Sequence, residues 1–155
     1  MKKRRIDFVE SIEEIGIEIW NNLADSDNPF TRYEFLHSLE SSGCTTESTG
    51  WQPFHVLVRE SDTEIENYNQ PIAVMPLYLK SNSWGEYVFD WSWAEAYARY
   101  GIDYYPKFVT SIPFTPSCGS RIMTKEGVDQ TTVARFIFEK IQEKSELLKA
   151  SSWHV

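Results

Sequence analysis

Apolar and polar residues follow two different periods along the chain. Residues 5–9 predict a short strand, residues 51–60 alternate as a strand does, and residues 71–80 are nearly all apolar, as in a strand covered on both faces. Residues 12–24 and 129–149 carry apolar side chains at the spacing of a helix. This mixture of periods predicts an α/β fold.

Short polar motifs mark where the first two helices begin and end. Ser11 and Glu14 form a capping box, and Thr31 and Glu34 form a second one. The run DSDNP separates the two helices, and Gly43 stands where a helix C-cap is expected. We therefore expect a strand followed by two helices at the start of the chain.

The second half of the chain predicts further strands. Residues 87–90 and 107–114 are strand candidates, and residues 93–101 between them suit a short helix or turn. Pro76 cannot donate to a strand ladder, so we expect a bulge or an unpaired edge there. Residues 151–155 predict one more strand, which we expect to pair within the sheet with one neighbour missing.

Composition narrows the class of protein. A chain of 155 residues is one ordinary domain, residues 1–155, and its 41% hydrophobic and 15% aromatic content argues against disorder. The net charge of −8 argues against a partner bound through nucleic-acid phosphates, so we expect no DNA partner.

The number and spacing of the cysteines and histidines do not suggest a metal site. Cys44 and Cys118 have neither the number nor the spacing of a disulfide framework or a zinc site, and His37, His55 and His154 are scattered. The basic amino end turns acidic without an apolar stretch, and no apolar run is long enough to span a membrane. These features predict a cytoplasmic protein with no membrane span.

Ten aromatic residues lie in residues 85–116, and they favour two interpretations. They fill a core, or they line a sugar-binding or peptide-binding cleft together with the interleaved polar residues, and the two roles are compatible. We expect Phe89, Phe108 and Phe114, which have no polar atoms, to be buried. The candidate substrate-binding residues are Lys80, Trp91, Trp93, Tyr97, Tyr105, Lys107 and Thr115. Among them, we expect Trp93, Tyr97 and Tyr105 to border a cleft and to stay partly exposed.

Several long phrases resemble one known family. NPFTRYEFLHSLE, GWQPFHVLV, PLYLKSNSWGEYVFDW, YYPK and PFTP are similar to the amino-terminal part of bacterial FemAB-like proteins, which belong to the GNAT acyltransferase superfamily. The resemblance covers residues 28–121 strongly. It implies a GNAT-like mixed central sheet flanked by helices. Because family members generally have two such halves, it also implies a fold that is incomplete at the C-terminus, truncated in or after its fifth strand.

The resemblance also implies a function in peptidoglycan biosynthesis or recognition. Its chemistry is transfer of an acyl or aminoacyl group to an amine acceptor such as a cell-wall precursor, with acyl-CoA or aminoacyl-tRNA as donor and no required cofactor. Such transfer needs a base, and Asp90 and Glu95 are the candidates. Residues 114–130 lack the family's usual acyl-CoA loop pattern, with only Gly119 and Gly127 present, so we expect weak binding of acetyl-CoA.

Two alternatives to catalysis stay open. The chain is either a non-catalytic binding module, in which Trp91, Trp93, Tyr97 and Tyr105 hold a glycan or peptide, or an inactive fragment of an acyltransferase. We expect the chain by itself to be inactive as an enzyme. An open sheet edge would also favour self-association.

Overall fold

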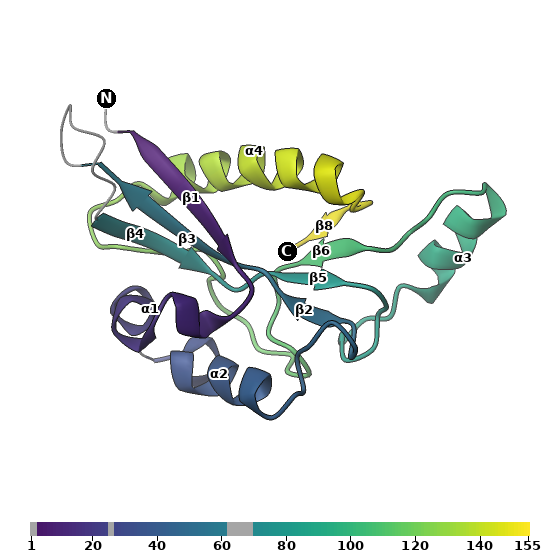
Figure 1. Ribbon diagram of the computed structural model, residues 1–155, viewed down its shortest axis with the longest axis horizontal. Coiled ribbons are helices and arrows are strands. Elements are labelled where there is room, and N and C mark those ends of the chain that lie inside the picture. Colours follow the sequence, from purple (N-terminus) through teal and green to yellow (C-terminus); the bar gives the residue numbers. More distant parts are fainter. Residues whose placement is uncertain (1–2, 25–26, 62–69) are drawn as a thin grey trace.

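The computed structural model describes residues 3–24, 27–61 and 70–155 of the protein. It is a mixed α/β structure in which two four-stranded sheets meet near the centre of the molecule (Figure 1). Helix α4 lies along one side of the sheets, α1 and α2 lie on the other, and α3 projects away from the rest (Figure 1). Within these ranges, no helix is long and apolar enough to cross a membrane.

The strands form two sheets, of which one is purely antiparallel and the other is mixed. The first sheet is antiparallel and contains, in order, β1 (Arg4–Val9), β3 (His55–Glu60), β4 (Gln70–Met75) and β7 (Met123–Thr124). The second contains β2 (Trp51–Pro53), β5 (Tyr78–Lys80), β6 (Lys107–Val109) and β8 (Trp153–His154). In the second sheet β8 runs parallel to β6, and the other pairs are antiparallel.

In the described part of the chain, four α-helices and two short 3-10 helices accompany the sheets. They are the 3-10 turn Ile12–Glu14, α1 (Ile17–Leu23), the 3-10 turn Pro29–Thr31, α2 (Tyr33–Ser41), α3 (Trp91–Arg99) and α4 (Gln130–Leu148). The long predicted helix over residues 129–149 is confirmed, with Asp129 accepting a hydrogen bond from the Thr131 N–H at its N-cap. The helix expected within residues 93–101 is confirmed as α3.

Two predicted strands are each split between the sheets. The strand expected over residues 51–60 breaks at Phe54 into β2 and β3, and the strand expected over residues 71–80 breaks at Pro76 and Leu77 into β4 and β5. Pro76 is left out of the strand pairing, in keeping with the bulge or unpaired edge expected there, whereas the break at Phe54 is a correction. The two breaks lie side by side, because the Phe54 N–H donates to the Leu77 carbonyl at 2.8 Å. The two-stranded ribbon therefore passes from one sheet to the other at this point.

The first helices also differ in part from the prediction. The capping box at Ser11 is confirmed, but Gly16 adopts a φ of 85° and divides the expected helix into a 3-10 turn and α1. The second capping box is wrong. The Thr31 hydroxyl donates to the Asn28 carbonyl, and α2 begins later, with Arg32 as its N-cap. Gly43 follows the end of α2 with a φ of 76°, as its C-cap role predicts.

The remaining strand predictions have mixed outcomes. Residues 87–90 are irregular rather than a strand, and the strand expected over residues 107–114 is limited to β6. The predicted pairing of residues 151–155 is confirmed, because β8 pairs with β6 and is the last strand of its sheet.

Alternating residues of β3 pack into two separate cores. Val56 and Val58 face a cluster under α4 that includes Phe108 and Ile137, while Leu57 faces a cluster under α1 and α2. Both faces of this strand are therefore covered, which explains why it is almost entirely buried. Burial of a side chain such as that of Phe108 stabilises the fold by about 1.5–3 kcal/mol.

Candidate functional site

Two buried lysines lie on the two middle strands of the second sheet. Lys80 on β5 lies directly opposite Lys107 on β6, and both side chains are fully buried. Lysine is rarely buried without a compensating partner. The groups around each side-chain nitrogen therefore have to offset the free energy that burial of a lysine costs.

Carboxylates compensate the charge of Lys107. Its Nζ donates to Glu86 Oε2 at 2.8 Å and to Asp90 Oδ2, and it lies 5.6 Å from the ring centroid of Tyr104. Asp90 belongs to the segment just before α3, so this ion pair ties the projecting helix to β6. The positive charge of Lys107 is therefore compensated by two carboxylates, those of Glu86 and Asp90.

Lys80 is held differently. Its Nζ donates to the Trp84 carbonyl at 2.9 Å, lies 3.7 Å from the ring centroid of Trp51, and is 4.0 Å from Glu86 Oε1. Burial lowers the pKa of Lys80 to about 7, because the attraction of Glu86 does not offset desolvation and the repulsion of Lys107. A substantial fraction of Lys80 is therefore neutral near pH 7.

His154, near the end of the sequence, lies beside Asp90, the carboxylate that pairs with Lys107. Its Nδ1 lies 3.7 Å from Asp90 Oδ2, and its Nε2 lies 3.1 Å from the Ser152 hydroxyl and 3.5 Å from the Tyr104 hydroxyl. The imidazole keeps 38% of its side-chain surface exposed. An imidazole with a solvent-accessible edge and a carboxylate nearby can exchange a proton with a bound ligand.

The negative charge of Asp90 is stabilised by Lys107, Tyr104 and His154. Burial raises the pKa of Asp90, but hydrogen bonds from Lys107 and Tyr104 and the charges of Lys107 and His154 outweigh burial, so this pKa lies below its usual value. Asp90 is therefore ionised at neutral pH and held in place beside the imidazole.

An open hollow of about 370 Å³ adjoins this network. Its lining brings together carboxylates, an imidazole, hydroxyls and a guanidinium, including Glu86, Asp90, Thr110, Thr115, Arg121 and His154. A site lined in this way can orient a polar ligand through hydrogen bonds and exchange a proton with it.

The comparison with protein families decides the identity. Residues 11–155 match the model of the FemAB-like family, which is described as peptidoglycan biosynthesis/recognition. The chain belongs to the FemAB-like family. The comparison with curated proteins found no match, and neither did the comparison with solved structures. Family membership confirms the resemblance seen in the sequence and connects this chain with peptidoglycan biosynthesis or recognition.

The FemAB-like chain gathers only part of the residue set expected from its sequence. Asp90 and Thr115 line the hollow, and Lys80 and Lys107 lie buried in the sheet beside it. Glu95 is exposed on α3, where its carboxylate pairs with Arg99 at 2.7 Å. The hollow's described lining does not include Glu95 or the aromatic candidates Trp91, Trp93, Tyr97 and Tyr105.

Sequence reasoning missed His154 and Glu86 as site residues. In the sequence His154 is separated from Asp90 by all of α3 and all of α4, and its role depends on the parallel pairing of β8 with β6. The predicted strand at residues 151–155 was the available signal, but it did not indicate which strand would be the neighbour.

The aromatic segment divides between core and surface. Phe108 is fully buried as predicted, but Phe89 and Phe114 are 47% and 52% exposed, so the prediction of burial is wrong for both. Neither residue lies in a strand, so neither side chain is directed into a sheet core. Trp93, Tyr97 and Tyr105 keep partial exposure, as predicted.

Exposed rings gather beside α3 in the FemAB-like chain. Trp84, Phe89 and Trp91 contact one another with centroid distances of 5.0 to 6.2 Å, and all three are exposed. Below, these three residues are called the aromatic surface. Its flat ring faces suit stacking against a sugar or another planar group.

Proposed function

We propose that this FemAB-like chain takes part in transfer of an acyl or aminoacyl group to an amine of a peptidoglycan precursor, with the hollow beside His154 as the acceptor site. A GNAT-like fold is part of this proposal, and it is supported by the mixed α/β architecture together with the family. The observation that carries it is the half-exposed His154 beside the ionised carboxylate of Asp90 at the wall of the hollow.

The proposed transfer has two steps, and His154 takes up a proton in the first and returns it in the second. The neutral amine attacks the donor's carbonyl carbon, and His154 accepts the proton that the nitrogen loses. Asp90 stabilises the imidazolium that forms, and Lys107 acts as a positioning residue because it keeps Asp90 charged and in place. When the carbonyl–leaving-group bond breaks, the imidazolium returns its proton to the departing thiolate or ribose oxygen. The products are the new amide and the free thiol or hydroxyl.

A transfer assay tests this proposal. The protein is incubated with a muropeptide that bears a free side-chain amine, with acetyl-CoA or an aminoacyl-tRNA as donor in separate reactions, and the product is measured by mass spectrometry. The proposal predicts a mass gain with at least one donor, which would overturn the expectation from the sequence that the chain by itself is inactive, and a loss of about 10²- to 10⁴-fold in rate for His154→Gln. His37→Gln is the matched control, because His37 lies on α2 away from this hollow. No mass gain with either donor, or an unchanged rate in His154→Gln, would contradict the proposal.

The aromatic surface supports a second candidate function, recognition without catalysis. Its three rings lie near the hollow but outside its described lining, so they suit the glycan part of a wall fragment. Calorimetry with a soluble β-1,4-linked N-acetylglucosamine oligomer would detect this binding. Recognition alone predicts that Trp91→Ala abolishes binding while His154→Gln leaves it unchanged and no transfer product forms.

A further inference from the structure

Arg121 supplies the hollow beside His154 with a guanidinium group that has no acidic partner. The residue is half-buried and lines this hollow. Its Nη1 donates to the Gly119 carbonyl at 3.3 Å and its Nη2 donates to the Ser117 carbonyl, and among the described residues no carboxylate pairs with it. A charged group that loses part of its hydration normally gains a partner of opposite charge. The structure therefore leaves this guanidinium incompletely compensated.

The existing bonds of Arg121 leave hydrogen-bond donors available. A guanidinium has five N–H donors, and the described partners are two backbone carbonyls and, at 3.5 Å, the Ser117 hydroxyl. At least two donors therefore have no partner in the described part of the chain. The Nε atom is one of these unpaired donors, and it is not buried from solvent. A ligand in the hollow can therefore reach it.

The backbone on both sides of Arg121 is held in place. Asn28 Nδ2 donates to the Cys118 carbonyl at 3.2 Å, and Gln130 Nε2 donates to the Ile122 carbonyl at 2.7 Å. These bonds connect the segment to the 3-10 turn before α2 and to the first turn of α4. The position of the guanidinium is therefore fixed before a ligand arrives, which reduces the ordering that binding requires.

The electrostatics of Arg121 favour an added negative charge. Burial lowers the pKa of Arg121 below its usual value, and although Cys118 opposes this shift, no described carboxylate does. Arginine nevertheless stays positively charged at neutral pH. An anion bound in the hollow would therefore offset the desolvation of the guanidinium.

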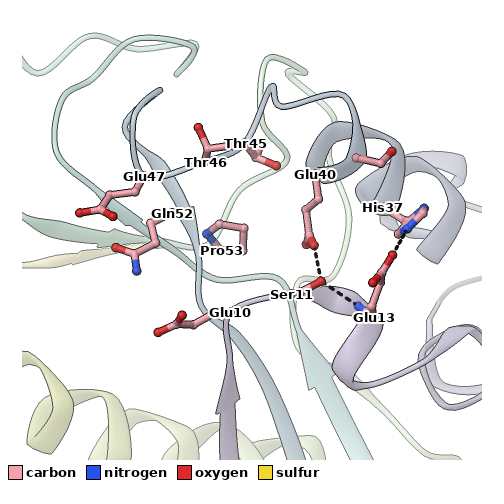
Figure 2. Close-up of a pocket in the computed structure, with 11 residues that line it drawn as sticks. Glu10, Ser11, Glu13, His37, Glu40, Thr45, Thr46, Glu47, Gln52 and Pro53 are labelled. Atoms are coloured by element: carbon pink, nitrogen blue, oxygen red, sulfur yellow. Dashed lines mark hydrogen bonds and ion pairs between the residues drawn. The ribbon is translucent and has the colours of Figure 1, made fainter.

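A second hollow, with a volume of about 440 Å³, has the opposite charge. Its described lining contains no lysine or arginine. Figure 2 shows that four carboxylates line it instead, those of Glu10, Glu13, Glu40 and Glu47. Of these two hollows, an anionic ligand therefore fits the one that contains Arg121.

The charges around Arg121 favour a carboxylate over a phosphate. Arg121 is the one lysine or arginine in the described lining of its hollow. The acidic residues of that lining, Glu86 and Asp90, both pair with the buried Lys107. A carboxylate carries one negative charge and matches one planar guanidinium, whereas a phosphate dianion would be repelled more strongly by the two acidic residues.

We propose that Arg121 binds a carboxylate of the acceptor, so that the hollow selects amines that carry an acidic group in the same molecule. The proposal rests on the proposed function, which places the acceptor's amine beside His154. Both residues line one hollow, whose volume of about 370 Å³ lies in the range of small-molecule sites. The expected ligand is therefore an amino acid or a short peptide with a free carboxylate.

Calorimetry with matched acids and amides tests the proposal without any acyl donor. The probes are Nα-acetyl-lysine and glycylglycine, each compared with its own carboxamide, which keeps the amine and lacks the carboxylate. We expect the acid of at least one pair to bind roughly 10- to 100-fold more tightly than its amide. Equal binding in both pairs would overturn the proposal. Tighter binding of O-phosphoethanolamine than of β-alanine would also overturn it, because phosphate would then be the preferred anion.

Variants of Arg121 separate ligand binding from a structural role. Arg121→Gln should abolish the preference for the acid, and Arg121→Lys should keep part of it, because lysine has the charge without the planar fork. Arg135→Gln, at an exposed position of α4, is the charge-matched control and should keep the preference. Circular dichroism checks the folding of each variant. If Arg121 only holds its own loop in place, Arg121→Gln will weaken the acid and the amide equally, which would refute the proposal.

The transfer assay distinguishes failure of this proposal from failure of the proposed function. A preference for acids that depends on Arg121, without any transfer product, would refute the transfer reaction and support the carboxylate site. Where transfer occurs, Arg121→Gln should raise the KM of the acid acceptor roughly tenfold or more and change kcat little, because the bond is made equally in the ground state and the transition state. The same KM for acid and amide acceptors would refute the carboxylate site.

Discussion

Replacing Lys80 by methionine should change how the stability of this protein depends on pH. Methionine has a similar length but no charge, so Lys80→Met keeps most of the packing beside Trp51 and removes the buried amine. It also removes the hydrogen bond from Nζ to the Trp84 carbonyl. The titration of Lys80 is therefore the main property that distinguishes the two proteins.

The magnitude follows from the pKa of Lys80 in the two states. This pKa is about 7 in the folded protein, against a reference value of 10.5 for an unperturbed lysine. Between these pH values the unfolded chain binds more protons than the folded chain, so stability rises with pH by up to about 1.4 kcal/mol per unit. The destabilisation caused by burying Lys80 is complete below pH 7 and disappears as the pH approaches 10.5. Between pH 7.5 and 9.5 the wild type should gain about 2.5 kcal/mol from this group.

Urea denaturation followed by tryptophan fluorescence measures this effect. The free energy of unfolding is determined at several pH values from 6.5 to 9.5 for the wild type and Lys80→Met, so that groups common to both cancel in the difference. We expect the advantage of Lys80→Met over the wild type to shrink by about 2.5 kcal/mol between pH 7.5 and 9.5. Lys125→Met, at an exposed position, is the control and should show no such trend. A difference that does not change with pH would refute the reasoning, and would mean that the Trp51 ring and Glu86 hold Lys80 fully charged.

Four further expectations follow from the structure. Phe108→Ala should destabilise the protein by about 3–5 kcal/mol, whereas Phe89→Ala should cost about 1 kcal/mol or less because its ring is half exposed, and denaturant midpoints compare the two. Lys107→Met should cost about 3–5 kcal/mol in the same measurement, since it leaves Asp90 with a buried charge and no ammonium partner; a smaller loss would show that water replaces the lysine. Calorimetry should find no micromolar binding of acetyl-CoA, because the chain at residues 114–130 lacks the expected loop pattern, and a micromolar dissociation constant would contradict this. Because β8 is the last strand of its sheet, sizing chromatography should show self-association at high concentration, and a constant monomeric elution volume would count against it.

Several elements were predictable because neighbouring residues determine them. The apolar stripe and N-cap of α4, the glycine after α2 and the break at Pro76 all depend on side chains a few positions apart. The second capping box failed although its residue types were suitable, because Asn28 and Pro29 had already begun a separate 3-10 turn that includes Thr31. Local motifs therefore predict where a helix can begin, and competing neighbours decide where it does begin.

The candidate site was predictable in part. Asp90 and Thr115 were recognised because polar residues stood among aromatic ones, and both line the hollow. His154 was not recognised, because its neighbours come from β6 and from the segment before α3. Likewise, an apolar residue such as Phe89 suggests a core position in any sequence, but its exposure depends on whether another segment covers it.

The sequence by itself determined the family, the α/β class, the long helix α4 and the aromatic character of residues 85–116. The tertiary structure alone decided that the ribbon crosses between sheets at Phe54, that Lys80 and Lys107 face each other, and that His154 lies beside Asp90. The physical reason is that helical and strand periods are properties of adjacent residues. Desolvation and the charges that shift a pKa depend instead on segments brought together from distant parts of the chain.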